Sequence, residues 1–284
     1  MSVEINIEHL NQWVGNTEQA EDRVAARPAA ALAATLDRQS SHPKDGDRLP
    51  YLWHWLYFLS CHDASELGED GHAKLGGFLP PVPLPRRMWA GSRFEFGQPL
   101  QIGEAIQRES RIKSINIKQG RSGTLGFVEV EHRITGDRGG GILEQHDIVY
   151  REPSPPGASA RPAAQAPDGA GWTVTIHPDP VLLFRYSAVT FNGHRIHYDR
   201  DYCRRVEGYE GLVVHGPLIA TLLLEHAGRQ YPDLNLSRFS FRAVSPTLDT
   251  RPFKVSGARD GDQLKLWASS MDGVLAMQAE AQCA

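Results

Sequence analysis

Residues 213–229 read VVHGPLIATLLLEHAGR, and this stretch sets the architecture of the carboxy-terminal half. It is apolar on most sides, and a proline follows His215 and Gly216. Proline is favoured in the first turn of a helix, because its missing N–H would have no intrahelical acceptor there. The sequence therefore predicts a buried helix that starts at His215-Gly216-Pro217 and runs to about Arg229.

Short segments in which apolar and polar residues alternate follow this helix. They predict four strands, at residues 238–244, 252–257, 264–269 and 274–282. An antiparallel sheet of such strands has one apolar face, and that face is stable only when another element covers it. We therefore expect the helix to be wrapped by a curved antiparallel sheet.

The amino-terminal half repeats this order of elements. Helical patterns lie within residues 5–37, and the apolar stretch 49–59, with Pro50 in its first turn, predicts a second buried helix. Strands are predicted at 112–118, 125–134 and 142–150. A local echo, Arg-Phe-Glu-Phe at 93–96 against Arg-Phe-Ser-Phe at 238–241, supports two related halves. The predicted class is α+β, with two long central helices that are each wrapped by a curved antiparallel sheet.

A segment rich in Pro, Ala, Gly and Ser separates the two halves. It spans residues 153–171 and lacks periodicity, which is typical of a linker. We therefore predict an amino-terminal domain at 1–152 with a helical extension and a carboxy-terminal domain at 172–284.

The composition excludes several classes of partner. The chain has 284 residues, 40% of them hydrophobic, and a net charge of only -4 with scattered Lys and Arg, so neither nucleic acid nor a membrane surface is an expected partner. Residues 1–10 lack the pattern of a targeting segment, so a cytoplasmic location is expected. The three cysteines are far apart and suggest neither disulfides nor a zinc site.

Reactive side chains are densest in the segment 186–199, which includes Asn192, His194, His197 and Asp199. A single histidine is more often structural than catalytic, but here several reactive groups lie beside Gly193, which permits tight backbone geometry. Asp199 is interpreted either as a helix cap, which is the favoured reading, or as a partner of the His197 ring. His62 and His72 are expected to be structural, and chemistry should survive substitution of His72, because no partner signature accompanies them.

These residues resemble the MaoC-like, (R)-specific enoyl-CoA hydratase family. The family motif places an acid, two residues, Pro, one residue, His, one residue and Asp in order; here Asn192 falls at the acid, Arg195 at the Pro, His197 at the catalytic His and Asp199 at the last Asp. A second signature matches Val213-Val214-His215-Gly216.

The first half, through residues 72–78 and 87–91, is similar to the amino-terminal part of members that act on mesaconyl-C4-CoA or itaconyl-CoA. This resemblance implies a double hotdog fold, with one active site per chain at the mouth of the second hotdog and no working acid–base set in the first.

Hydration of an enoyl thioester needs a base for water, an acid for the α-carbon and a donor to the thioester oxygen. We expect His197 to take the proton and Asn192, whose amide cannot exchange one, to orient the water. The N–H of Gly216, at a helix start, should face the thioester oxygen. His194, Arg195 and His215 are predicted to bind substrate; Arg195 could bind an acyl carboxylate or simply face solvent.

The resulting hypothesis is a hydro-lyase for a short branched dicarboxylyl-CoA, such as mesaconyl-C4-CoA or itaconyl-CoA. No metal and no cofactor are expected besides the CoA of the substrate, and the chain could form a homodimer. Two alternatives remain open, a hotdog thioesterase that directs water at the carbonyl carbon and a non-catalytic acyl-CoA-binding protein.

Overall fold

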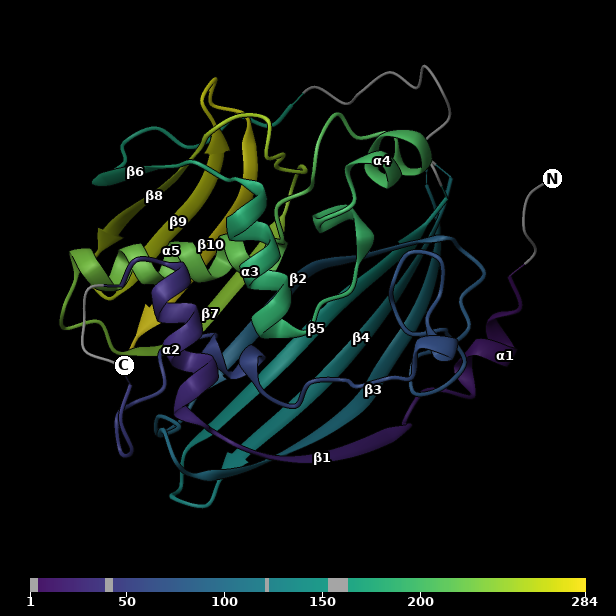
Figure 1. Cartoon of the computed structure of the whole chain (residues 1–284), viewed down its shortest axis with the longest axis horizontal. Helices are drawn as coiled ribbons and strands as arrows, with labels where there is room; N and C mark the ends of the chain where they lie inside the picture. The colour runs from purple at the N-terminus through teal and green to yellow at the C-terminus, as the bar shows by residue number, and fades with distance from the viewer. Residues whose placement is uncertain (1–4, 39–42, 121–122, 153–162) are drawn as a thin grey trace.

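The computed structural model describes residues 5–38, 43–120, 123–152 and 163–284, and its main feature is one ten-stranded antiparallel sheet. The order β1-β3-β4-β5-β2-β7-β10-β9-β8-β6 places the strands of the first half on one side and those of the second half on the other (Figure 1). The strands are β1 Thr17–Arg23, β2 Arg86–Phe96, β3 Ala105–Gly120, β4 Gly123–Gly136, β5 Gly141–Arg151, β6 Trp172–Ile176, β7 Leu236–Ala243, β8 Phe253–Asp260, β9 Gln263–Ser270 and β10 Leu275–Cys283.

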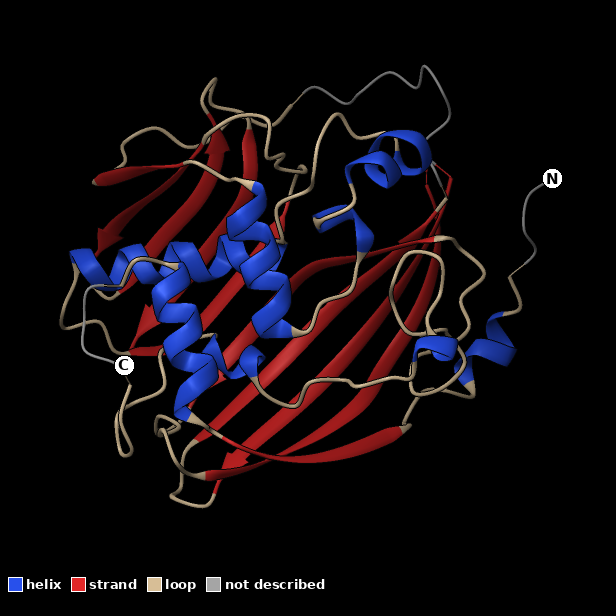
Figure 2. Cartoon of the chain, in the orientation of Figure 1, coloured by secondary structure: helices blue, strands red, loops and turns tan. Residues whose placement is uncertain are grey.

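The helices are few and short beside this sheet (Figure 2). The α-helices are α1 Ile7–Asn11, α2 Ala26–Thr35, α3 Pro180–Thr190, α4 Arg200–Tyr202 and α5 Gly216–Gln230. Single turns of other helix types lie at Trp53–Leu56, Ala64–Glu66, Arg195–His197 and Cys203–Glu207. Helices α2, α3 and α5 gather on one face of the sheet, where α2 contacts α3 and α5 packs on β8, β9 and β10.

The two halves meet at the echo found in the sequence. Strand β2 pairs with β7 antiparallel, and Phe94 lies opposite Phe239 in the register. Their rings stack with centroids 5.9 Å apart, and both side chains are buried. The echo thus marks the strand pair through which the halves form one sheet.

The elements predicted for the second half are confirmed. Helix α5 starts at Gly216 with Pro217 in its first turn and ends at Gln230, one residue past the prediction. Its apolar side chains, Leu218 and Leu223 among them, are buried against the sheet. The four predicted strands are present as β7 to β10, with ends that differ by up to three residues.

The long helix predicted at residues 49–59 is wrong. Only a single 3-10 turn, Trp53–Leu56, forms there, because Leu52 (φ 68°) and Phe58 (φ 56°) have left-handed backbone conformations that a right-handed helix cannot contain. The predicted burial is nevertheless correct, since Leu52 and Leu56 are at most 2% exposed. The expectation of two long central helices is therefore not confirmed.

The amino-terminal segment also differs from the helical pattern. Its first helix is α1, but residues 17–23 form β1, a largely exposed edge strand paired with β3. Hydrogen bonds to a neighbouring strand thus decide the structure of a polar run that has little helical signal of its own. Helix α2 begins at Ala26, so Pro28 lies in its first turn, where proline is tolerated.

Strand β5 ends at Arg151 and β6 begins at Trp172, beside the boundaries predicted at 152 and 172. Residues 153–162 of the predicted linker lie outside the described residues. Farther along it, Gln165 forms a β-bridge with Val274, so this part lies against the β9–β10 turn. The division into domains stays a prediction. Within the described ranges, no helix is both long and apolar enough to cross a membrane.

Candidate active site

Helix α3 positions the segment that carries the reactive side chains. It begins at Pro180, after the Asp179 carboxylate accepts the N–H of Leu182 at 2.7 Å, and it ends at Phe191 in a left-handed conformation (φ 50°). The chain then turns, and the end of the segment packs against the residues before α5: the N–H of Val213 donates to the Ile196 carbonyl, and the His197 ring stacks on that of His215. Helix α3 was not predicted from the sequence, although an Asp-Pro start is a common helix signal.

His197 is buried, with 7% of its surface exposed. Its Nδ1 lies 2.7 Å from the carbonyl oxygen of Val213. A carbonyl can only accept, so Nδ1 carries the proton and the neutral ring presents Nε2 as its basic nitrogen. Burial lowers the pKa of His197 to about 4, although the Val213 carbonyl raises it. His197 is therefore neutral at pH 7, and its role as the catalytic base stays a prediction.

The His215 ring is in face-to-face contact with the His197 ring. The two rings stack with centroids 3.6 Å apart and an interplanar angle of 18°. His215 is 0% exposed, and its Nε2 lies 2.8 Å from the Ser187 hydroxyl oxygen of α3. Burial lowers its pKa well below the ordinary value, as do the neighbouring His197 and His194. Direct contact of His215 with substrate stays a prediction, and its burial favours a role in positioning His197.

Gly216 is the first residue of α5, so its N–H has no acceptor inside the helix. A β-carbon built on it would meet only the Met277 methyl, at 4.0 Å. The open space beside an orphan N–H at a helix amino terminus suits an oxygen that gains negative charge.

Asn192 is held by two backbone contacts. Its N–H donates to the Ser187 carbonyl at 2.8 Å, and its Oδ1 accepts the N–H of His194 at 2.9 Å. This turn leaves the two N–H donors of the amide for another partner. Orientation of water by Asn192 stays a prediction.

Arg195 is already engaged on three sides. Its guanidinium pairs with Asp199 (2.7 Å), donates to the Glu69 carbonyl (3.0 Å) and lies 4.2 Å from the centre of the Tyr202 ring. Asp199 also accepts the N–H of Tyr202 at 2.9 Å, which confirms that it caps α4. These contacts indicate that Arg195 braces the loop; its contact with an acyl carboxylate stays a prediction.

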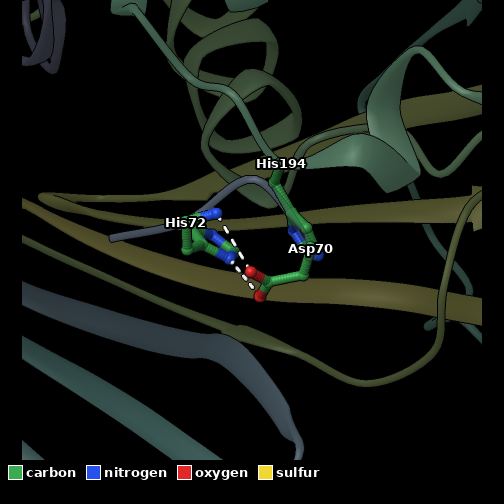
Figure 3. Close-up of side chains that lie close together, drawn as sticks. All are labelled: Asp70, His72 and His194. Atoms are coloured by element: carbon green, nitrogen blue, oxygen red, sulfur yellow. Dashed lines mark hydrogen bonds and ion pairs between the residues drawn. The ribbon is translucent and has the colours of Figure 1, made fainter. Parts of the chain in front are cut away.

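The structure brings a segment of the first half into this site. Asp70 and His72 form a pair in which His72 Nδ1 lies 2.8 Å from Asp70 Oδ2, and the His72 ring lies against the His194 ring with centroids 4.1 Å apart (Figure 3). The His194 ring in turn lies 5.4 Å from that of His197. His72 was expected to have no partner, and this is wrong. The signal in the sequence was the spacing of Asp70-Gly71-His72.

Glycines allow the two segments to approach closely. A β-carbon on Gly71, whose φ is 87°, would lie 2.0 Å from the Gly193 carbonyl oxygen. The backbone N–H of Arg195 donates to the Asp70 carbonyl at 2.9 Å. The contact between the halves is thus made by the backbone and fixes where the Asp70 and His72 side chains lie.

Asp70, His72 and His194 also form a set that could hold a metal ion. One potential ligand atom from each lies within 4.8 Å of the others. One carboxylate with two imidazoles suits zinc, but the His72–Asp70 hydrogen bond already occupies one atom of each partner. The prediction that the protein needs no metal stays a prediction.

The first half contains a buried polar cluster of its own, around Glu144 of β5. Its carboxylate lies 3.2 Å from His54 Nε2 and accepts hydrogen bonds from Trp55 Nε1 (3.2 Å) and the Ser92 hydroxyl (3.0 Å). Burial would raise the pKa of Glu144, but the hydrogen bond and charge of His54 lower it to about 2. Three groups thus hold the Glu144 carboxylate inside the first half, while His54 Nδ1 is buried without a hydrogen-bond partner among the described residues.

A cavity of about 680 Å³ lies elsewhere, at the carboxy-terminal end of α5, and its lining includes Arg48, Leu224 and Arg229. None of the histidines near His197 lines it. Because catalysis depends on groups that can move protons rather than on volume, we place the active site at the opposite end of α5.

Comparisons with known proteins identify the family of this chain. The family model for hydroxyacyl-thioester dehydratase type 2 matches residues 52–249, which include both the Asp70–His72 pair and His197. The chain is 48% identical over 267 residues to mesaconyl-C(4)-CoA hydratase of Chloroflexus aurantiacus, with 94% of this chain and 95% of that protein covered.

Solved structures share the fold at low identity. A MaoC-like dehydratase from Phytophthora capsici matches with a TM-score of 0.68 and 14% identity over 99% of both chains. A conserved Mycobacterium tuberculosis protein with a double hotdog fold matches with a TM-score of 0.56 and 14% identity over 95% of this chain and 96% of that one. The chain therefore belongs to the hydroxyacyl-thioester dehydratase type 2 family, and its fold is a double hotdog of the MaoC-like kind.

Proposed function

We propose that the protein adds water reversibly to the double bond of a short, branched dicarboxylyl-CoA, with mesaconyl-C4-CoA as the first candidate and itaconyl-CoA as the second. A hydro-lyase acting on an unsaturated acyl-CoA follows from the family and from the similarity to a mesaconyl-C(4)-CoA hydratase. The observation that carries the reaction is the state of His197, which is buried and neutral and whose Nδ1 is bound to the Val213 carbonyl, so that Nε2 is its basic nitrogen. Its ring stacks on that of His215, the residue that precedes Gly216.

In the hydration direction, the thioester oxygen accepts a hydrogen bond from the Gly216 N–H. Water held by the Asn192 amide attacks the β-carbon as His197 Nε2 takes its proton. Negative charge develops on the thioester oxygen, where the start of α5 stabilises it, until the proton taken from the water is returned at the α-carbon and the addition is complete. His215 stacks on the His197 ring and, through Ser187, ties it to α3.

The acidic acyl chain is supported by a cation other than Arg195. Arg87 of β2 lies close enough for its charge to lower the pKa of both His72 and His194. Its guanidinium interacts with the Tyr150 hydroxyl, and among the ion pairs of the described part of the chain it has no carboxylate partner, unlike the adjacent Arg86, which pairs with Glu207. A partly buried arginine without an acidic partner near the histidines suits a substrate carboxylate.

The test is a panel of enoyl-CoAs, comprising crotonyl, mesaconyl-C4 and itaconyl forms, followed by enoyl absorbance and by product mass. We expect a product heavier by one water, with the highest kcat/KM for a dicarboxylyl substrate. Release of free CoA thiol without a change in the double bond would identify a thioesterase. Tight binding without turnover would identify an acyl-CoA-binding protein.

Three further proposals complete this function. The reaction uses no cofactor besides the CoA of its substrate, because imidazoles and a helix start suffice for the proton and charge transfers described. We also propose a cytoplasmic location.

A homodimer is proposed as well, because β1 and β6 are the edge strands of the sheet among the described residues, and the outer backbone groups of an edge strand can pair with a second chain. The mass of the purified protein in solution tests the dimer.

A further inference from the structure

Hydration moves protons at two places, the water oxygen and the α-carbon. His197 offers a single free nitrogen, because its Nδ1 is bound to the Val213 carbonyl. Asn192 precedes it by five residues in the same segment but carries an amide, which cannot exchange a proton at neutral pH. The segment 186–199 by itself therefore supplies one proton-transfer group for two positions.

The first half supplies a second imidazole at this place. His72 is partly open, with 26% of its side chain exposed, whereas His197 is buried. The rings of His72, His194 and His197 follow one another, with centroid distances of 4.1 Å and 5.4 Å. The backbone contact of Gly71 with Gly193 holds this arrangement.

Asp70 orients His72 and prepares it to carry charge. Its Oδ1 accepts the backbone N–H of His72 at 3.0 Å, and its Oδ2 lies 2.8 Å from Nδ1 of the ring. Burial would raise the pKa of Asp70, but the hydrogen bonds and charge of His72 hold it well below its usual range. An ionised carboxylate on Nδ1 fixes the tautomer, leaves Nε2 free and stabilises the imidazolium when it forms.

We propose that His72, held by Asp70, is a second catalytic acid–base residue of this site, which handles the proton at the α-carbon while His197 handles the proton of the water. This inference rests on the hydro-lyase function proposed above. It goes beyond that function because it assigns catalytic residues of one active site to both halves of the chain.

The proton balance starts with both imidazoles neutral. The water oxygen bonds to the β-carbon, the π electrons move toward the α-carbon and the thioester oxygen, and His197 Nε2 takes the proton that water loses. That proton passes to His72 Nε2 through a bound water or the His194 ring. His72 then gives it to the α-carbon, so both hydrogens of the water end in the product and both rings are neutral again.

The charges around His72 favour this direction of transfer. Burial lowers the pKa of His72 and the nearby Arg87 lowers it further, while Asp70 raises it. His194 also faces the ring but is held neutral by burial and by its histidine neighbours. The Nδ1 of His197 contacts a neutral carbonyl oxygen, whereas the Nδ1 of His72 contacts a carboxylate oxygen. An imidazolium is therefore better stabilised at His72.

Hydrogen exchange at the α-carbon separates the two roles. The hydrated acyl-CoA product is incubated in D₂O with wild type, His72→Gln, Asp70→Asn or His197→Gln, and deuterium at the α-carbon and formation of the enoyl-CoA are followed by mass. We expect His72→Gln to lose both exchange and dehydration by roughly 10²–10⁴-fold. His197→Gln should lose dehydration to a similar extent while exchange stays within about tenfold of wild type, because its task lies at the oxygen.

Asp70→Asn should lower exchange by less than His72→Gln, because the amide oxygen still accepts from Nδ1 but no longer stabilises the imidazolium. His62→Gln is the matched control: His62 lies in the same region, 46% exposed and paired with Glu66, and its loss should leave both rates unchanged. Thermal unfolding of each variant separates loss of fold from loss of chemistry.

Exchange within about threefold of wild type in a folded His72→Gln variant would overturn the proposal, since a catalytic imidazole is worth far more than that. One tightly bound metal ion per chain, whose removal abolishes exchange, would assign Asp70, His72 and His194 to a metal instead. If wild type hydrates none of the enoyl-CoAs in the panel above, the proposed function fails first. Hydration by wild type together with an active His72→Gln variant overturns only this inference.

Discussion

The stacked rings of His197 and His215, 3.6 Å apart between centroids, place two buried imidazoles in face-to-face contact. A charge on either ring would face the other ring without a carboxylate partner, so burial keeps both neutral and lowers their pKa. The same contact that keeps His197 ready to accept a proton therefore makes the fold sensitive to acid.

Stability should fall as the pH is lowered below about 6.5, the ordinary pKa of histidine. Below this pH, His197 binds a proton in the unfolded chain, whereas in the folded chain it stays neutral until the pH reaches about 4. Each pKa unit corresponds to about 1.4 kcal/mol, so His197 alone should remove roughly 3 kcal/mol from the free energy of unfolding between these values. Urea unfolding from pH 7.5 to 4 measures this, and His197→Gln should show a shallower dependence. Equal slopes in the two proteins would contradict it.

Substitution of His197 tests the base directly. His197→Ala should lower kcat by roughly 10²–10⁴-fold, the usual worth of a positioned acid–base group, and should leave substrate affinity nearly unchanged. Steady-state hydration rates and titration of a non-reactive acyl-CoA measure the two quantities. A variant that keeps more than about a tenth of the wild-type kcat would show that His197 is not the base.

The close approach of the two segments predicts an effect of a single methyl group. Gly71→Ala places a β-carbon 2.0 Å from the Gly193 carbonyl oxygen, so the segments must separate and activity should fall at least roughly tenfold, as catalytic misplacement of about 1 Å is costly. Gly139 is the matched control, because its φ is also 87° but nothing lies within 4 Å of the new β-carbon. Gly139→Ala should carry the same backbone strain with unchanged kcat. Comparable loss in both variants would show that strain, rather than contact, is responsible.

The carboxylate partner of the substrate is tested at Arg87. Arg87→Gln should lower kcat/KM for mesaconyl-C4-CoA by roughly 10- to 100-fold, since a hydrogen bond to a charged group is worth about 1.5–3 kcal/mol. Crotonyl-CoA has no acyl carboxylate and serves as the internal control. A parallel loss for both substrates would place the role of Arg87 in the histidine cluster rather than in recognition of the acyl chain.

Periodicity predicted the strands on both sides of the sheet and the helix α5, because each of these elements has one strong local pattern. It failed at residues 49–59, where an apolar stretch is buried as an irregular segment: apolarity indicates burial but does not determine the backbone conformation. Strand β1 was missed because an edge strand is defined by its partner β3 rather than by its own residues.

The residues of the candidate active site also divide into those indicated by a local pattern and those that depend on contacts with distant residues. Asn192 and His197 could be proposed from the sequence because they lie five residues apart in one segment, and Gly216 because it starts a helix. Asp70 and His72 are separated from His197 by more than a hundred residues, and only the pairing of the two halves brings them into contact with His194. Local motifs could therefore indicate the chemistry but not the contact of the first half with this segment.

Asn192 provides the last prediction, because here the chain departs from the carboxylate of the family motif. Asn192→Asp keeps the oxygen that accepts the His194 N–H at 2.9 Å, so the turn should persist. The new charge should repel a substrate carboxylate, whereas an uncharged acyl chain is unaffected, so the ratio of kcat/KM for mesaconyl-C4-CoA to that for crotonyl-CoA should fall. Asn192→Ala should lose the orientation of water but no proton acceptor, and should therefore cost less than His197→Ala. The ratio is measured at several pH values, since protonation of the new carboxyl at low pH should restore it. A ratio that stays constant would mean that Asn192 does not face the acyl carboxylate, and recognition of the dicarboxylate would then depend on Arg87.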